Sequence, residues 1–166
     1  GYTNDQGAIL KAHPEWAETS LDGKLLSPNG GYWISPCVDE ARGFLAELLA
    51  ELVTKYDVDG LHLDYVRYES ESSASYGYSP ASKAAFVSQY GFDPAGIQPF
   101  SIEQYQWNKF RERQINTFVQ RVALQTRRLK PRVKLSAAVA PEPARCMTET
   151  YSGVSNWWSA ARIVAA

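Results

Sequence analysis

The clearest hydrophobic pattern in the chain lies between residues 37 and 56, where apolar residues recur every three or four positions. This spacing places them on one face of a helix. The serine and proline at Ser35-Pro36 are typical of a helix start. The predicted buried face consists of Val38, Ala41, Phe44, Leu45, Leu48, Leu49, Leu52 and Val53. We therefore expect a helix over 37–56 that packs against the core.

A second, longer amphipathic helix is predicted after residue 101. Ser101 and Gln104 have the spacing of a capping box, and Pro131 is expected to end the helix. Its predicted buried face consists of Trp107, Phe110, Gln114, Ile115, Phe118, Val119 and Val122. A shorter helix is expected near 80–90, because Ser79-Pro80 favours a helix start and Gly91 a helix stop.

Two short apolar runs, about residues 60–65 and 133–140, are typical of buried strands. Residues 1–31 are predicted to be mainly loop with a helical turn around 5–12, and a last helix is expected near Ser155. Helices and strands thus alternate, as in a parallel α/β sheet. Two or three strands cannot close a barrel, so a barrel would have only its middle in this chain.

Polar residues interrupt the first strand on one face only. Leu61 and Leu63 share the face expected to pack under the helices, whereas His62 and Asp64 share the other. Asp64 lies at the carboxyl end of the strand, where barrel enzymes place their active sites. We expect Asp64 to be functional, although it could instead pair with Arg67 or cap a loop.

The neighbouring polar residues have weaker assignments. Asp57 and Asp59, at the other end of the strand, are expected to shape a turn. His62 is either a hydrogen-bonded core residue or part of the site. Arg67 could orient Asp64 and lower its pKa, bind a sugar hydroxyl, or form an ordinary surface ion pair.

Glycoside hydrolysis usually needs two carboxyl groups. Glu142 follows the second strand and is the provisional second acid, although a glutamate beside prolines on a loop is often only solvated. Glu69 and Glu71 are weaker alternatives, and the partner could lie outside these residues. Aromatic residues gather in strand-end and post-strand segments, where rings can stack on sugars or simply pack. These aromatic residues are Trp33, Tyr65, Tyr68, Tyr76 and Tyr78.

Composition narrows the possible partners. The 166 residues are 45% hydrophobic, which is enough for a single core, and the net charge of −1 gives no reason to expect nucleic acid. The basic residues of the long helix are interpreted as its solvated side: Lys109, Arg111, Arg113, Arg121, Arg127, Arg128 and Lys130. No apolar run is long enough to span a membrane.

No metal or cofactor is predicted from the sequence. His13 and His62 are far apart in sequence, and no group of His, Cys and Asp has ligand spacing. Cys37 and Cys146 are too few for a disulfide framework, so we expect small packing residues rather than a single disulfide. The chain begins at Gly1 without a signal-peptide pattern and is expected to be a piece of something longer.

Several blocks of the sequence resemble the glycosyl-hydrolase-like family 10 of bacterial TIM barrels. The blocks are "HPEW" at 13–16, "YWISPCVDEARGFLAELLAELVTKYDVDGLHLDYVRY" at 32–68, "YGYSPAS" at 76–82 and "KPRVKLSAAV" at 130–139. The resemblance implies that residues 1–166 are one partial domain, the central segment of a (β/α)8 barrel from about strand three or four to the helix before strand six. It also implies an exported hydrolase of a polysaccharide or cell-wall glycan.

Within this resemblance, Asp64 matches the family's aspartate at strand four, and Tyr65, Arg67 and Tyr68 match the motif behind it. The chain has Ser35-Pro36 where relatives commonly have Asn-Pro. Glu142 matches no firm family motif.

The sequence therefore predicts a glycoside hydrolase with Asp64 as nucleophile or general base, Glu142 as provisional second acid, and no cofactor. The expected substrate-binding residues are Trp33, His62, Tyr65, Arg67, Tyr68 and Tyr76. The alternative is a non-catalytic carbohydrate-binding module, in which Asp64 only forms hydrogen bonds.

Overall fold

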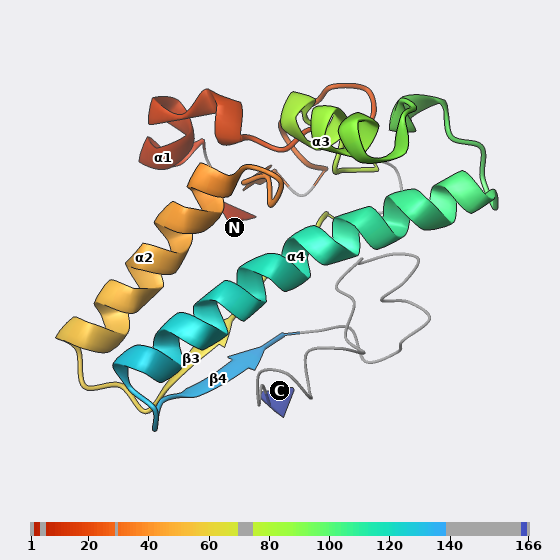
Figure 1. The fold of residues 1–166 in the computed structure, drawn as a ribbon. Coiled ribbons are helices and arrows are strands. Elements are labelled where there is room, and N and C mark those ends of the chain that lie inside the picture. The colour runs from red at the N-terminus through yellow and green to blue at the C-terminus, as the bar shows by residue number, and fades with distance from the viewer. Residues whose placement is uncertain (1, 4–5, 29, 70–74, 139–163, 166) are drawn as a thin grey trace.

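The computed structural model describes residues 2–3, 6–28, 30–69, 75–138 and 164–165. Two long helices, α2 (Asp39–Lys55) and α4 (Ile102–Leu129), pack against each other and lie over a small parallel sheet (Figure 1). This arrangement confirms the predicted mixture of helices and parallel strands.

The sheet is built from strands that run in the same direction. β3 (Gly60–Leu63) pairs with β4 (Lys134–Ala137), and β4 pairs with β5 (Val164–Ala165), all in parallel. The carboxyl ends of β3 and β4 therefore lie at one edge of the sheet (Figure 1). The part of the chain that the structure describes contains no closed barrel, because these strands form an open sheet.

The main core lies between the sheet and the two helices. Leu63 and Leu135 of the strands pack with helix residues, among them Ile115, Val119 and Val122, and Leu61 packs partly buried against this cluster. The prediction that Leu61 and Leu63 share the helix-facing side of the strand is thus confirmed.

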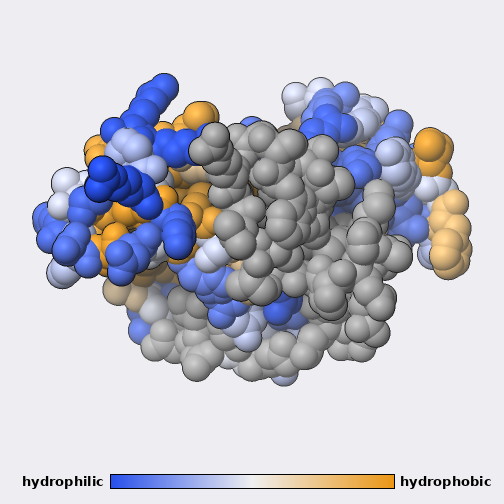
Figure 2. Space-filling model, turned by 90° about the horizontal axis from the view of Figure 1, so that it is seen from below, coloured by the Kyte–Doolittle hydropathy of each residue, from blue (hydrophilic) through white to orange (hydrophobic). Residues whose placement is uncertain are grey.

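The predicted buried face of α2 is partly wrong. The buried residues are Ala41, Ala46, Ala50 and Val53. Phe44, Leu48 and Leu52 are exposed instead, because the apolar stripe is wider than the surface that α4 and the sheet cover. Figure 2 shows hydrophobic surface among hydrophilic residues on its left, the side on which α2 and α4 end in Figure 1.

The start of α2 also differs from the prediction. The helix begins at Asp39 with Val38 as its N-cap. Ser35 does not cap it, because the Ser35 hydroxyl donates a hydrogen bond to a buried glutamate, Glu18, at 2.7 Å. Pro36 therefore lies before the helix rather than inside its first turn.

The other helices follow their predicted signals closely. α3 (Pro80–Tyr90) is capped by Ser79 and ends at Gly91, whose φ is 84°. α4 is capped by Ser101, whose hydroxyl accepts a hydrogen bond from the Gln104 amide at 3.1 Å.

The N-terminal part of the chain contains short elements. β1 (Tyr2–Thr3) pairs antiparallel with β2 (Tyr32–Trp33). The 3-10 helix η1 (Pro14–Trp16) follows α1 (Gly7–Ala12), and a second, η2 (Pro94–Gly96), follows α3. No described helix is both long enough and apolar enough to cross a membrane.

Candidate functional site

Asp64 is the first residue after β3, and its side chain is exposed at the carboxyl edge of the sheet. One carboxylate oxygen, Oδ1, accepts a hydrogen bond from the amide of Tyr65 at 2.8 Å. No other hydrogen bond to this carboxylate is present among the described residues. Asp64 thus has one oxygen bonded to the backbone and is accessible to a ligand, which suits a nucleophile or a general base.

Tyr65 has an unusual backbone conformation. Its φ is 52°, in the left-handed region that residues other than glycine rarely adopt. This conformation costs roughly 1–2 kcal/mol in an L-residue. It is local strain directly behind the predicted catalytic residue, the kind of place where functional sites store strain.

Tyr65, the residue after Asp64, packs together with Arg67 and Trp33. The Arg67 guanidinium carbon lies 4.9 Å from the centre of the Tyr65 ring and 5.8 Å from that of Trp33. The two aromatic rings meet edge to face, with centres 6.1 Å apart. Tyr65 is 39% exposed, whereas Trp33 is only 3% exposed. Tyr65 and the half-buried Arg67 therefore form the accessible surface, and Trp33 supports it from inside.

A buried carboxylate lies behind this cluster. Glu69 is 3% exposed and accepts a hydrogen bond from the indole Nε1 of Trp33 at 3.0 Å. Tyr76 is also buried, and its pKa is raised to about 12 by burial and by the negative charges of Glu69 and Asp22. The Tyr76 hydroxyl has no hydrogen-bond partner among the described residues.

His62 contacts the neighbouring strand β4 rather than the residues described above. It is exposed on the same face as Asp64, and its Nδ1 lies 2.9 Å from the Ser136 hydroxyl, which is its partner in the β3–β4 register. The side chain is therefore neither a buried core histidine nor a group held against Asp64.

Tyr68 is fully buried, and it belongs to the main hydrophobic core. Its hydroxyl lies 3.7 Å from the sulfur of Cys37. Burial raises the pKa of Cys37 to about 11 and raises the pKa of Tyr68 well above its usual range. Both groups are thus neutral at neutral pH, and Cys37 forms no disulfide with any described residue.

Glu18, which is 1% exposed, lies at the centre of a buried polar cluster. Its Oε1 accepts hydrogen bonds from the amides of Thr19 at 3.0 Å and Ser79 at 2.6 Å. Its Oε2 accepts from the hydroxyls of Ser35 at 2.7 Å and Ser82 at 3.0 Å. Burial raises the pKa of Glu18, and the hydrogen bonds oppose that shift. Glu18 joins the N-terminal segment to the starts of α2 and α3.

Arg111 is buried, contrary to its predicted place on the solvated side of α4. Its guanidinium donates to the backbone oxygen of Tyr76 at 2.6 Å and lies 5.1 Å from the ring centre of Trp107. A Cβ added to Gly77, whose φ is +110°, would lie 2.7 Å from the Arg111 Cδ. Arg111 therefore holds the segment that enters α3.

Glu18 was not predicted from the sequence, and nothing in the sequence indicated that Arg111 would be buried. Neither has a local signal, since Glu18 lies in a loop 17 residues before Ser35 and Arg111 lies among other basic residues. Glu142, Glu71 and Cys146, together with the helix expected near Ser155, lie outside the described residues. What the sequence predicts for these residues stays a prediction.

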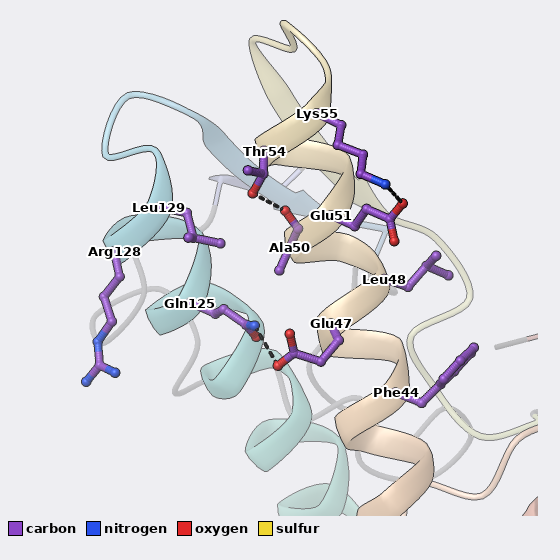
Figure 3. Close-up of a pocket in the computed structure, with 10 residues that line it drawn as sticks. All are labelled: Phe44, Glu47, Leu48, Ala50, Glu51, Thr54, Lys55, Gln125, Arg128 and Leu129. Carbon is purple, nitrogen blue, oxygen red and sulfur yellow. Dashed lines mark hydrogen bonds and ion pairs between the residues drawn. The ribbon is translucent and has the colours of Figure 1, made fainter.

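One groove on the described surface is lined by none of the predicted site residues. This open groove of about 580 Å³ lies between α2 and α4 and is lined by residues that include Phe44, Leu48 and Leu129 (Figure 3). Lys55 pairs there with Glu51 at 2.6 Å. Among the described residues, no three side chains of His, Cys, Asp or Glu lie close enough to hold a metal ion.

Comparison with known proteins gives one family and one distant relative. Residues 2–165 match the family described as Glycosyl hydrolase-like 10. The chain is also 28% identical over 151 residues to an S-layer-related protein of Niallia circulans. This match takes in 76% of the chain, which spans only 9% of the length of that relative. Because the family match leaves out only the first and last residues, the chain belongs to the Glycosyl hydrolase-like 10 family, as its sequence blocks predicted.

Proposed function

We propose that this protein hydrolyses glycosidic bonds in a bacterial polysaccharide or cell-wall glycan, with Asp64 as the catalytic carboxylate. The observation that carries the proposal is the exposed carboxylate of Asp64 at the carboxyl end of a parallel strand, beside the Tyr65 and Arg67 surface. Membership of a glycosyl-hydrolase-like family supports it. The parallel sheet with helices on one face supports a further proposal, that these residues form the middle of a (β/α)8 barrel.

In this mechanism water adds across the bond between the anomeric carbon and the glycosidic oxygen. Asp64 acts on the anomeric carbon either directly, as nucleophile, or by removing a proton from the attacking water. A second carboxylic acid donates the proton that the leaving oxygen takes up, and Glu142 is the provisional candidate. Tyr65 presents an aromatic face on which a sugar ring can stack, and Arg67 can donate hydrogen bonds to hydroxyl groups.

The proposed substrate also gives a proposed location. The relative that matches most of the chain is described as S-layer-related, and a glycan of the cell envelope would be met outside the cytoplasm. We therefore expect an exported protein whose partner is carbohydrate.

The direct test compares two aspartates at opposite ends of β3. Asp64→Asn should lower the rate of cleavage of glycan strands, cellohexaose or chitohexaose by a factor of about 10³. Binding of the same probes should be retained. Asp57→Asn is the matched control, since Asp57 is also exposed but lies near Lys130 at the other end of the strand. Its turnover should be unchanged. Binding without turnover in the wild-type protein would instead favour a carbohydrate-binding module.

A further inference from the structure

Glu69 links two segments that are far apart in the sequence. It follows β3, whereas Trp33 belongs to β2, and the hydrogen bond from the Trp33 indole to Glu69 spans 36 residues at 3.0 Å. Both side chains are 3% exposed. A buried carboxylate is costly unless it is hydrogen-bonded, so this contact stabilises both groups.

The orientation of Trp33 in turn affects the accessible surface. The Tyr65 ring packs against the Trp33 ring, and the Arg67 guanidinium lies over both rings. A rotation of the indole would therefore displace Tyr65 and Arg67 together. These are the two residues that the proposed function brings into contact with the glycan.

Because Glu69 is buried, it is not a candidate for the second catalytic acid. A carboxyl group that is 3% exposed and bonded to an indole does not reach a glycosidic oxygen outside the protein, whereas Asp64 is exposed. The contact with Trp33 needs only a hydrogen-bond acceptor at position 69. It does not need a group that transfers a proton.

We propose that Glu69 is a positioning residue, which holds the Trp33 indole and thereby keeps Tyr65 and Arg67 in the orientation that binds the glycan. This inference rests on the proposed function and deepens it. Glu69 is assigned to recognition through other side chains, and the proton donor of the reaction is another group.

Three variants of the purified protein separate these roles. Glu69→Gln keeps an oxygen that can accept from the indole but cannot transfer a proton. Glu69→Leu removes the acceptor, and Trp33→Phe removes the donor. Glu112→Gln is the control, because Glu112 is another buried glutamate, bonded to Lys109 at 2.7 Å within α4.

The expected kinetics follow from the hydrogen bond. Glu69→Gln and Glu112→Gln should keep kcat/KM within about threefold of the wild-type value. Glu69→Leu and Trp33→Phe should each lose about tenfold or more, mainly through KM. The loss in the double variant Glu69→Leu/Trp33→Phe should be smaller than the product of the two single losses, since both changes break the hydrogen bond between positions 33 and 69.

A spectroscopic measurement makes the test independent of turnover. The indole N–H resonance of Trp33, assigned by its loss in Trp33→Phe, should be preserved in Glu69→Gln and shifted in Glu69→Leu. Should Glu69→Leu fail to fold, Trp33→Phe and Glu69→Gln still carry the comparison.

The outcomes separate the two proposals. A loss of kcat in Glu69→Gln as large as in Glu69→Leu would overturn the positioning role and identify a proton donor. Wild-type kinetics and an unshifted resonance in Glu69→Leu would also overturn it. A wild-type protein that binds the glycan probes but cleaves none would contradict the proposed activity alone, and binding by the variants would then decide the positioning role. A wild-type protein that neither binds nor cleaves them would overturn both.

Discussion

The carboxylates of Glu18 and Asp64 differ in almost every physical respect. Glu18 is buried and accepts four hydrogen bonds from three segments of the chain. Asp64 is exposed and accepts one, from the next residue. The contacts of Glu18 are all made within the protein, so its role is structural. Asp64 keeps hydrogen-bonding capacity for a ligand, and the strained Tyr65 beside it supports that use.

This contrast predicts that changes around Glu18 alter stability and changes around Asp64 alter binding and turnover. The largest effect on stability is expected for Glu18→Leu, because it leaves the hydroxyls and amides that now bond to Glu18 buried without an acceptor. The loss in free energy of unfolding should be about 3 kcal/mol or more. Urea unfolding followed by circular dichroism measures it, and Asp64→Asn is the control, with a change of less than about 0.5 kcal/mol. Equal stability of the two variants would contradict the structural role of Glu18.

A second substitution tests whether the segment before α3 contributes to the stability of the fold through its contact with Arg111. Gly77→Ala places a Cβ 2.7 Å from the Arg111 Cδ at a φ of +110°. The expected loss is about 2–3 kcal/mol. Gly91→Ala is the matched control, since Gly91 has φ +84° but open space around its Cα, and it should lose only about 1 kcal/mol. Thermal unfolding of both variants gives the difference, and identical losses would contradict the contact.

Substitutions of Tyr65 separate the effect of its ring on glycan binding from the effect of its backbone conformation on stability. Tyr65→Gly and Tyr65→Val both remove the ring that Arg67 covers, so glycan binding should weaken about tenfold or more in each. Their stabilities should differ, because glycine accepts a φ of 52° and a β-branched residue does not. Tyr65→Val should be less stable than Tyr65→Gly by about 1–2 kcal/mol in urea unfolding. Equal stabilities would mean that the left-handed conformation is absent in solution.

The smallest predicted effect is a pH dependence. Burial raises the pKa of Glu18 above the 4.5 of an unperturbed glutamate, so the folded state binds this proton more tightly than the unfolded state. The contribution to stability is therefore fully present below about pH 4.5 and is lost as the pH rises through the raised value. The free energy of unfolding of the wild-type protein, minus that of Glu18→Gln, should fall as the pH rises from 4 to 8. A rise in this difference would show that the hydrogen bonds outweigh burial.

The sequence predicted the elements whose signals are local. The caps at Ser79 and Ser101 and the stop at Gly91 are contacts between near neighbours, and α3 and α4 have them as expected. The faces of β3 also follow from alternation alone. The prediction for α2 failed where it depended on distant groups, since the partner of Ser35 is Glu18 and the coverage of Phe44 depends on what packs against the helix.

The same distinction applies to the site. Asp64, Tyr65 and Arg67 are predicted site residues because they closely follow a strand, and the structure places Tyr65 and Arg67 in contact. Trp33, Tyr68 and Tyr76 were expected to bind substrate, but their rings are buried, which spacing in the sequence cannot reveal. The bond between Trp33 and Glu69 depends on the tertiary fold and has no sequence signal of its own.

Isotope labelling measures whether the protein hydrolyses a glycan and whether Asp64 is needed for that reaction. Glycan strands, cellohexaose and chitohexaose would be incubated with wild-type protein and Asp64→Asn in water enriched in ¹⁸O, and the products weighed by mass spectrometry. We expect one ¹⁸O at each new reducing end with the wild-type protein, and no labelled product with Asp64→Asn. Labelled product at the wild-type rate from Asp64→Asn would show that Asp64 is not needed for hydrolysis. No labelled product from the wild-type protein on a probe that it binds would show that the protein does not hydrolyse that glycan.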